Sequence, residues 1–195
     1  MQELQRREER RIGIYVCHCG SNIAGVVDCA DVADYGQVLP DVVVSRHDGY
    51  LCSEPGQNQI KTDIREQRLN RIVVASCSPR LHEPTFRKCL SEAGLNPYLL
   101  EMANLREQCS WVHSHDPEGA TQKSKDLVRS AVARARWLDV RQESQVPVEP
   151  ATLVDRPDRA VPDGAAARLR APRAQRPRRA DRGPPQRGRD PGRGR

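Results

Sequence analysis

The chain has 195 residues, enough for one domain of ordinary size with residues to spare. Its net charge of +6 is unevenly distributed: residues 1–154 carry 19 Lys and Arg against 21 Asp and Glu, whereas residues 155–195 carry 13 Arg against 5 Asp. The basic character therefore belongs to the end of the chain, and it does not predict a nucleic-acid-binding surface on the folded part.

The first residues are charged, and no apolar segment indicates a signal peptide or a membrane span. We therefore expect a cytoplasmic protein with no membrane partner. Structural disulfides are not expected in that compartment, so the seven cysteines of the chain indicate metal binding or redox chemistry instead.

Apolar runs that alternate with helical patterns and turn residues organise the first 140 residues. The predicted strands are 11–16, 42–50, 71–76 and 98–102, and the predicted helices are 23–35, 56–69, 83–93 and 116–138. The third strand is a continuous apolar run, typical of a strand buried on both faces of a parallel sheet. This alternation predicts an α/β fold with a doubly wound, mostly parallel sheet of about four strands.

Composition divides the chain into four segments. They are a charged leader (1–10), a cysteine-rich α/β domain (11–140), a linker that runs into the start of another strand (141–154), and a tail (155–195). In the tail, 32 of 41 residues are Arg, Pro, Ala or Gly, and none is aromatic. Because such a segment can bury little apolar surface, we expect it to be disordered.

Five cysteines end or follow the predicted strands. They are Cys17, Cys19, Cys52, Cys77 and Cys109. Ligands of doubly wound sheets bind in the crevice beyond the carboxyl ends of the strands, so we expect these thiols to converge on one cofactor. A 4Fe-4S cluster needs four thiolates and would use four of the five. The short bite of the Cys17-x-Cys19 pair favours one of these two as the thiol left over, and the sequence leaves open which. Zinc and a dithiol redox centre are the alternatives.

The remaining polar and thiol residues receive weaker interpretations. The sequence Cys17-His18-Cys19 would also suit zinc, which accepts both sulfur and imidazole. Cys29 and Cys89 fall inside predicted helices and are expected to be packed thiols. Arg80 either offsets the negative charge of a reduced cluster or lies in a solvated loop, and Trp111 is expected to be a packing residue.

Four stretches combine into a specific set of motifs. They are Tyr-Val-Cys-His-Cys-Gly-Ser-Asn-Ile-Ala-Gly-Val-Val-Asp (15–28), Cys-Ser-Glu-Pro-Gly-Gln (52–57), Val-Val-Ala-Ser-Cys-Ser-Pro-Arg (73–80) with His-Glu-Pro-Thr-Phe (82–86), and Asn-Pro-Tyr-Leu-Leu-Glu-Met-Ala-Asn-Leu-Arg-Glu-Gln-Cys-Ser-Trp-Val-His (96–113). These motifs closely resemble the amino-terminal domain of the iron-sulfur A-type subunit of CoB–CoM heterodisulfide reductase, and the resemblance covers residues 11–154. In that family this domain carries a 4Fe-4S cluster, and Cys17, Cys19, Cys52, Cys77 and Cys109 match its motifs.

The resemblance also implies a function and partners. It implies an oxidoreductase that passes electrons between flavin or ferredoxin-type centres and a disulfide-reducing partner. The implied partners are other heterodisulfide reductase subunits and an electron-donor protein of the hydrogenase or dehydrogenase type. Two alternatives remain: a zinc-stabilised interaction module without redox activity, and an RNA-binding role for the Arg-rich tail, which we rank last.

The sequence departs from the family pattern after Val154. The family continues there into a glycine-rich strand-turn-helix that binds FAD, and this motif is absent here. We therefore expect the chain not to bind flavin tightly and not to be a competent enzyme alone. Residues 155–159 can be encoded by DNA that reads Ile-Gly-Arg-Ile one base later, close to the expected Ile-Gly-Gly-Ile. Our hypothesis is a frameshift that makes the tail an artefact.

Overall fold

The computed structural model describes residues 9–144 and 146–147. The chain divides into two units, Met1–Gln145 and Val146–Arg195. Only residues 146–147 of the second unit are described, so the prediction of a disordered tail lies outside the described residues. The charged leader is described only at residues 9 and 10.

Four parallel strands form the single sheet of the described chain. They are β1 (Ile12–Cys17), β2 (Val42–Asp48), β3 (Arg71–Ser76) and β4 (Leu100–Asn104), in the order β2-β1-β3-β4. Every neighbouring pair is parallel, and β1 is buried along its whole length. The predicted doubly wound α/β fold is therefore confirmed, with its most apolar strands, β1 and β3, in the centre.

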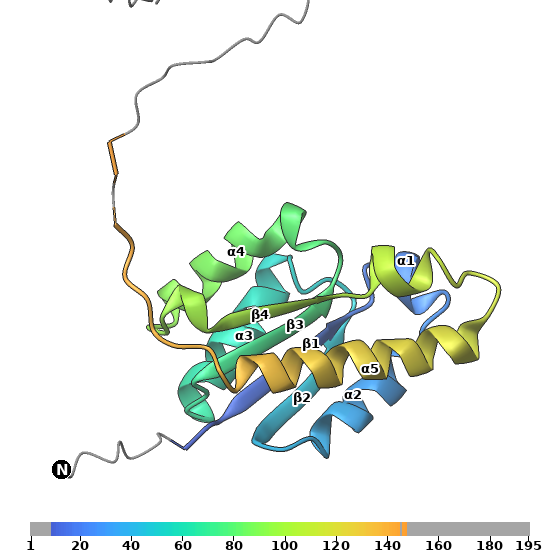
Figure 1. Cartoon of the computed structure of the whole chain (residues 1–195), viewed down its shortest axis with the longest axis horizontal. Coiled ribbons are helices and arrows are strands. Elements are labelled where there is room, and N and C mark those ends of the chain that lie inside the picture. The colour runs from blue at the N-terminus through green and yellow to red at the C-terminus, as the bar shows by residue number, and fades with distance from the viewer. Residues whose placement is uncertain (1–8, 145, 148–195) are drawn as a thin grey trace, which may run out of the picture. The chain divides into compact units, whose positions relative to one another are not determined.

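Helices cover both faces of this sheet (Figure 1). They are α1 (Ser21–Ala24), α2 (Cys29–Gln37), α3 (Glu54–Glu66), α4 (Pro79–Glu92) and α5 (Pro117–Ala135), with a 3₁₀ turn η1 (Pro97–Leu99) and a π-helical turn η2 (Arg106–Ser110). Alternate residues of β1 enter two separate cores. Ile14 and Val16 pack with α2 and α5, whereas Tyr15 and Cys17 pack with α3 and α4.

Local capping explains where the elements differ from the predicted ranges. The predicted helix 23–35 is two helices, because α1 ends at Gly25 and the Asp28 carboxylate starts α2 by accepting the Asp31 N–H at 3.0 Å. Helix α4 starts four residues earlier than predicted, since the Ser78 hydroxyl accepts the Arg80 N–H and Pro79 occupies the first turn. In both cases a capping side chain fixes the residue at which the helix starts, and in α4 a proline in the first turn contributes as well.

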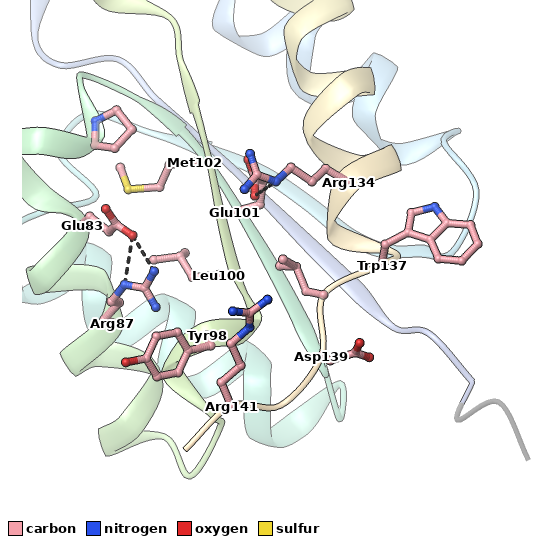
Figure 2. A pocket seen from close by; sticks show the side chains of 12 residues that line it. Glu83, Arg87, Tyr98, Leu100, Glu101, Met102, Arg134, Trp137, Asp139 and Arg141 are labelled. Carbon is pink, nitrogen blue, oxygen red and sulfur yellow. Dashed lines mark hydrogen bonds and ion pairs between the residues drawn. The ribbon is translucent and has the colours of Figure 1, made fainter. Parts of the chain in front are cut away.

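A cavity of about 560 Å³ lies beside the edge strand β4 (Figure 2). It is lined by α4, β4 and the segment that follows α5. Two of its arginines are neutralised within the chain, because Arg87 pairs with Glu83 and Arg134 pairs with Glu101. Arg141 is the third arginine of the lining and Asp139 its third carboxylate, so the lining has no net charge of the kind expected for an anion-binding site. Among the described residues, no helix is both long and apolar enough to cross a lipid bilayer.

Candidate metal centre

The carboxyl ends of the parallel strands bring three cysteine-bearing loops to one edge of the sheet. Cys17 is the last residue of β1, and Cys19 lies in the turn that follows it. Cys52 lies between β2 and α3, and Cys77 comes directly after β3. Because all strands run in the same direction, these loops all lie beyond the same end of the sheet.

A strained turn holds Cys17 and Cys19 close together. The backbones of Cys19 (φ 49°) and Gly20 (φ 59°) both have a positive φ, which a non-glycine residue seldom adopts. The Cys19 N–H donates to the Cys17 sulfur at 3.3 Å. The turn is tied to the loop after β2, since the His18 N–H donates to the Asp48 carbonyl at 2.8 Å. This geometry fixes two of the predicted thiols relative to the β2 loop that leads to Cys52.

Cys19 and Cys52 both act electrostatically on Cys17 and on Cys77. Burial raises the pKa of the Cys17 thiol; nearby backbone N–H groups oppose this shift, and Cys19 and Cys52 add to it. Burial likewise raises the pKa of Cys77, where Arg106 opposes the shift and Cys19 and Cys52 again add to it. These shared effects place the four thiols in one neighbourhood, as expected for loops that meet at one sheet edge.

The cation of this neighbourhood is Arg106, from η2, a residue that the sequence motifs did not single out. Its Nη1 lies 3.5 Å from the Cys19 sulfur, and its guanidinium carbon lies 4.8 Å from the centre of the Trp111 ring. Arg80, proposed from the sequence for this role, lines a cavity beside β4 instead. Trp111 is 55% exposed, so it is a platform for Arg106 rather than a core residue. Arg106 stands in the loop after β4, and that position was the signal by which it could have been found.

Cys109 has different surroundings from the other four predicted ligands. It lies in η2, is fully buried, and belongs to the core that α2 and α5 form over one face of the sheet. Burial raises the pKa of its thiol, and hydrogen bonding to Ser124 of α5 and the nearby Lys123 oppose that shift. None of the described electrostatic partners of Cys109 is another cysteine.

Cys29 and Cys89 are both buried, as predicted. Burial raises the pKa of Cys29 to about 12 and that of Cys89 to about 11. Cys29 is nevertheless closer to the site than expected, since its sulfur lies 4.0 Å from the Cys17 carbonyl oxygen on the α2 side of β1. Such protonated, enclosed thiols act as small apolar side chains.

The donor set fits an all-sulfur centre better than a mixed sulfur and imidazole centre. His18 Nε2 lies 2.9 Å from His47 Nδ1, so this imidazole is engaged with another histidine. In the part of the chain that the structure describes, no three His, Cys, Asp or Glu side chains are close enough together to enclose a metal ion. The four thiols of this neighbourhood match the number and type of ligands that a cubane cluster requires. A cubane cluster is larger than a single metal ion, so its ligands lie farther apart. The residues present therefore fit such a cluster in kind.

Comparisons with known proteins extend over most of the described domain. No family model matches the chain. It is 64% identical over 147 residues to the A-type subunit of the H(2):CoB-CoM heterodisulfide,ferredoxin reductase of Methanothermobacter thermautotrophicus. It is 61% identical over 147 residues to the second iron-sulfur A-type subunit of the CoB–CoM heterodisulfide reductase of Methanopyrus kandleri. Each match covers 75% of this chain but only 22% of the relative, so the chain spans about a fifth of the length of these relatives.

A third relative has a different electron donor in its name. The chain is 58% identical over 128 residues to the A-type subunit of the Ferredoxin/F(420)H(2)-dependent CoB-CoM heterodisulfide reductase of Methanosarcina acetivorans. This match covers 66% of the chain and 16% of the relative. The names of the relatives thus agree on the type of subunit, which belongs to a heterodisulfide reductase, but differ in the donor.

Proposed function

We propose that residues 11–140 form an iron-sulfur electron-transfer domain of an oxidoreductase. The matched region of the chain belongs to the family of heterodisulfide reductase A-type subunits. The observation that supports this proposal is that cysteines of three separate loops lie beyond the same end of the parallel sheet. When bound, a 4Fe-4S cluster would supply one-electron redox chemistry.

The proposed ligands are Cys17, Cys19, Cys52 and Cys77. The sequence favoured Cys17 or Cys19 as the fifth thiol. We propose Cys109 in its place, because its thiol lies in the core beneath α5 rather than among the others. Cys17 and Cys77 are 4% and 5% exposed, which would limit access of water to two ligands, while the partly exposed Cys19 and Cys52 would lie nearer the surface. This graded burial suits outer-sphere electron transfer, for which close approach of a partner is sufficient.

The reaction and partners of the whole protein are also proposed here. The domain would pass electrons between flavin or ferredoxin-type centres and a disulfide-reducing partner, with other reductase subunits and a donor protein completing a cytoplasmic complex. The names of the relatives support a heterodisulfide as the final acceptor and ferredoxin or F420H2 as a donor class. FAD would bind outside residues 11–140.

Anaerobic reconstitution with iron and sulfide, followed by metal analysis, tests the cluster. We expect about four iron and four sulfide per chain in the wild type. Cys77→Ser should lose most of the iron, whereas Cys109→Ser, the matched control, should keep it if it folds. One zinc per chain without acid-labile sulfide would favour the zinc-stabilised module, and loss of the cluster in folded Cys109→Ser would show that the proposed ligand set is wrong.

A further inference from the structure

We propose that Arg106 is a positioning residue that raises the reduction potential of the cluster centre through a charged hydrogen bond to the Cys19 sulfur. This inference rests on the proposed function, because it concerns the same thiols. It adds a residue that is not among the ligands and that lies on a different loop from all four of them.

Three contacts fix the guanidinium of Arg106. Its Nη1 lies 3.5 Å from the Cys19 sulfur, and its Nη2 lies 2.8 Å from a carboxylate oxygen of Glu107. The planar group also packs over the indole of Trp111, at 4.8 Å from the ring centre. Only 17% of the Arg106 side chain is exposed, so little water competes for its charge. A lysine ammonium is not planar, so it could not bond to Cys19 and Glu107 and also stack on the Trp111 ring as the guanidinium does.

The sign of the effect follows from charge. Four thiolates give the site a large negative charge, and reduction adds one more electron to it. A fixed cation at a ligand sulfur stabilises the reduced state more than the oxidised state, and a hydrogen bond to that sulfur acts in the same direction.

Glu107 works against this effect. Its carboxylate accepts from Arg106 Nη2 at 2.8 Å and from Arg106 Nε at 3.1 Å, and its negative charge partly offsets the charge of the guanidinium. Removing Arg106 and removing Glu107 should thus shift the reduction potential in opposite directions. A purely structural role for Arg106 does not predict opposite shifts.

The test is an anaerobic redox titration of the reconstituted full chain, followed by electron paramagnetic resonance, with iron and sulfide measured on each sample. The variants are Arg106→Gln, Glu107→Gln and the control Arg80→Gln, an arginine next to the Cys77 loop that has no described contact with a thiol. We expect Arg106→Gln to lower the equilibrium constant for reduction about tenfold, or about 59 mV for one electron. Glu107→Gln should raise it, and Arg80→Gln should leave it unchanged.

The outcomes separate this inference from the proposed function. A wild-type chain that assembles no cluster refutes the proposed function before Arg106 is tested. A cluster with an unchanged potential in Arg106→Gln overturns the inference and leaves the function standing. If Arg106→Gln does not retain iron, the same comparison is made between Arg106→Gln/Glu107→Gln and Glu107→Gln alone, where equal potentials would overturn the inference.

Discussion

Cys89 is a buried thiol whose titration should be visible in the stability of the domain. It is fully buried between α3 and α4, its sulfur lies 3.4 Å from the Gln57 carbonyl, and burial raises its pKa from 9.0 to about 11. A pKa that is higher in the folded state means that stability is complete below pH 9 and falls as the pH rises toward 11. The thiolate is the form that the core excludes.

The variant Cys89→Ala isolates this titration. Alanine leaves a small cavity, which lowers the free energy of unfolding by a constant amount at every pH. Between pH 9 and 11 the wild type should lose up to about 1.4 kcal/mol per pH unit more than the variant. Urea unfolding of both proteins at a series of pH values measures the difference. Parallel curves above pH 9 would contradict the assignment.

Asp63 is a buried carboxylate that ties α3 to β1 and β2. Its side chain is 2% exposed and accepts from Arg46 Nε at 2.9 Å and from the Tyr15 hydroxyl at 3.1 Å. Burial and the neighbouring Asp63 carboxylate both raise the pKa of Tyr15, so the hydroxyl remains a donor. Removal of either partner leaves the carboxylate with fewer hydrogen bonds in a site that water does not reach.

Two substitutions rank these contacts. Tyr15→Phe should lower the free energy of unfolding by about 1 kcal/mol, the net value of one hydrogen bond. Arg46→Ala should cost about 2 kcal/mol, because it removes a charged pair, although the partial exposure of Arg46 reduces the penalty. Arg129→Ala breaks an exposed pair with Asp126 and serves as the control, within about 0.5 kcal/mol of the wild type. Equal losses in Arg46→Ala and Arg129→Ala would refute the role of Asp63.

At the scale of elements, the start of α3 is packed directly against the loop that carries Cys52. A Cβ atom at Gly56 would lie 2.6 Å from both the Leu51 Cα and the Tyr50 carbonyl oxygen. These neighbours are backbone atoms, so the helix and the loop would have to move apart. Gly56 therefore sets the distance between the first turn of α3 and the loop that presents a proposed ligand.

Gly56→Ala tests this close approach. We expect a loss of about 2 kcal/mol in the free energy of unfolding, together with a lower iron content after reconstitution, because the Cys52 loop is displaced. Gly49→Ala, in the same connection, is the matched control, since no atom lies within 4 Å of its added Cβ. It should keep wild-type iron content. An equally stable Gly56→Ala with full iron content would show that the loop position does not depend on this contact.

The elements also show which features the sequence could and could not predict. The strands were predictable because β1 and β3 are continuous apolar runs, and with them the edge at which the thiols lie. The sequence could not predict which four of the five thiols would lie together. This choice depends on which face α5 covers, and α5 packs on the α2 side and takes Cys109 into that core. An amphipathic pattern gives the width of an apolar stripe but not the face of the sheet that receives it.

At the scale of the whole molecule, the handedness of the connections limits what can extend the sheet at β4. The chain moves from β2 to β3 and from β3 to β4 through α3 and α4, which share one face. Helix α5 lies on the other face, so a parallel strand placed beyond β4 after α5 would need a crossover of the opposite hand to these. Such crossovers are rare in proteins. The described residues that follow α5 accordingly pass this side of the sheet without forming a strand, and the Asn96 side-chain amide donates to the Arg141 carbonyl at 2.9 Å.

Charge separates the two ends of the chain and gives a final prediction. Residues 155–195 carry a net charge of +8, whereas residues 1–154 carry −2. Within residues 9–144 and 146–147, the core residues lie between Ile12 and Ala135. A chain that ends at residue 147 should therefore unfold at the same temperature as the full chain and reconstitute with the same iron content. It should also lose retention on heparin, which the arginines of the full chain provide through release of counterions. A lower melting temperature would mean that residues after 147 stabilise the domain, and equal retention would place a polyanion-binding surface on the α/β domain itself.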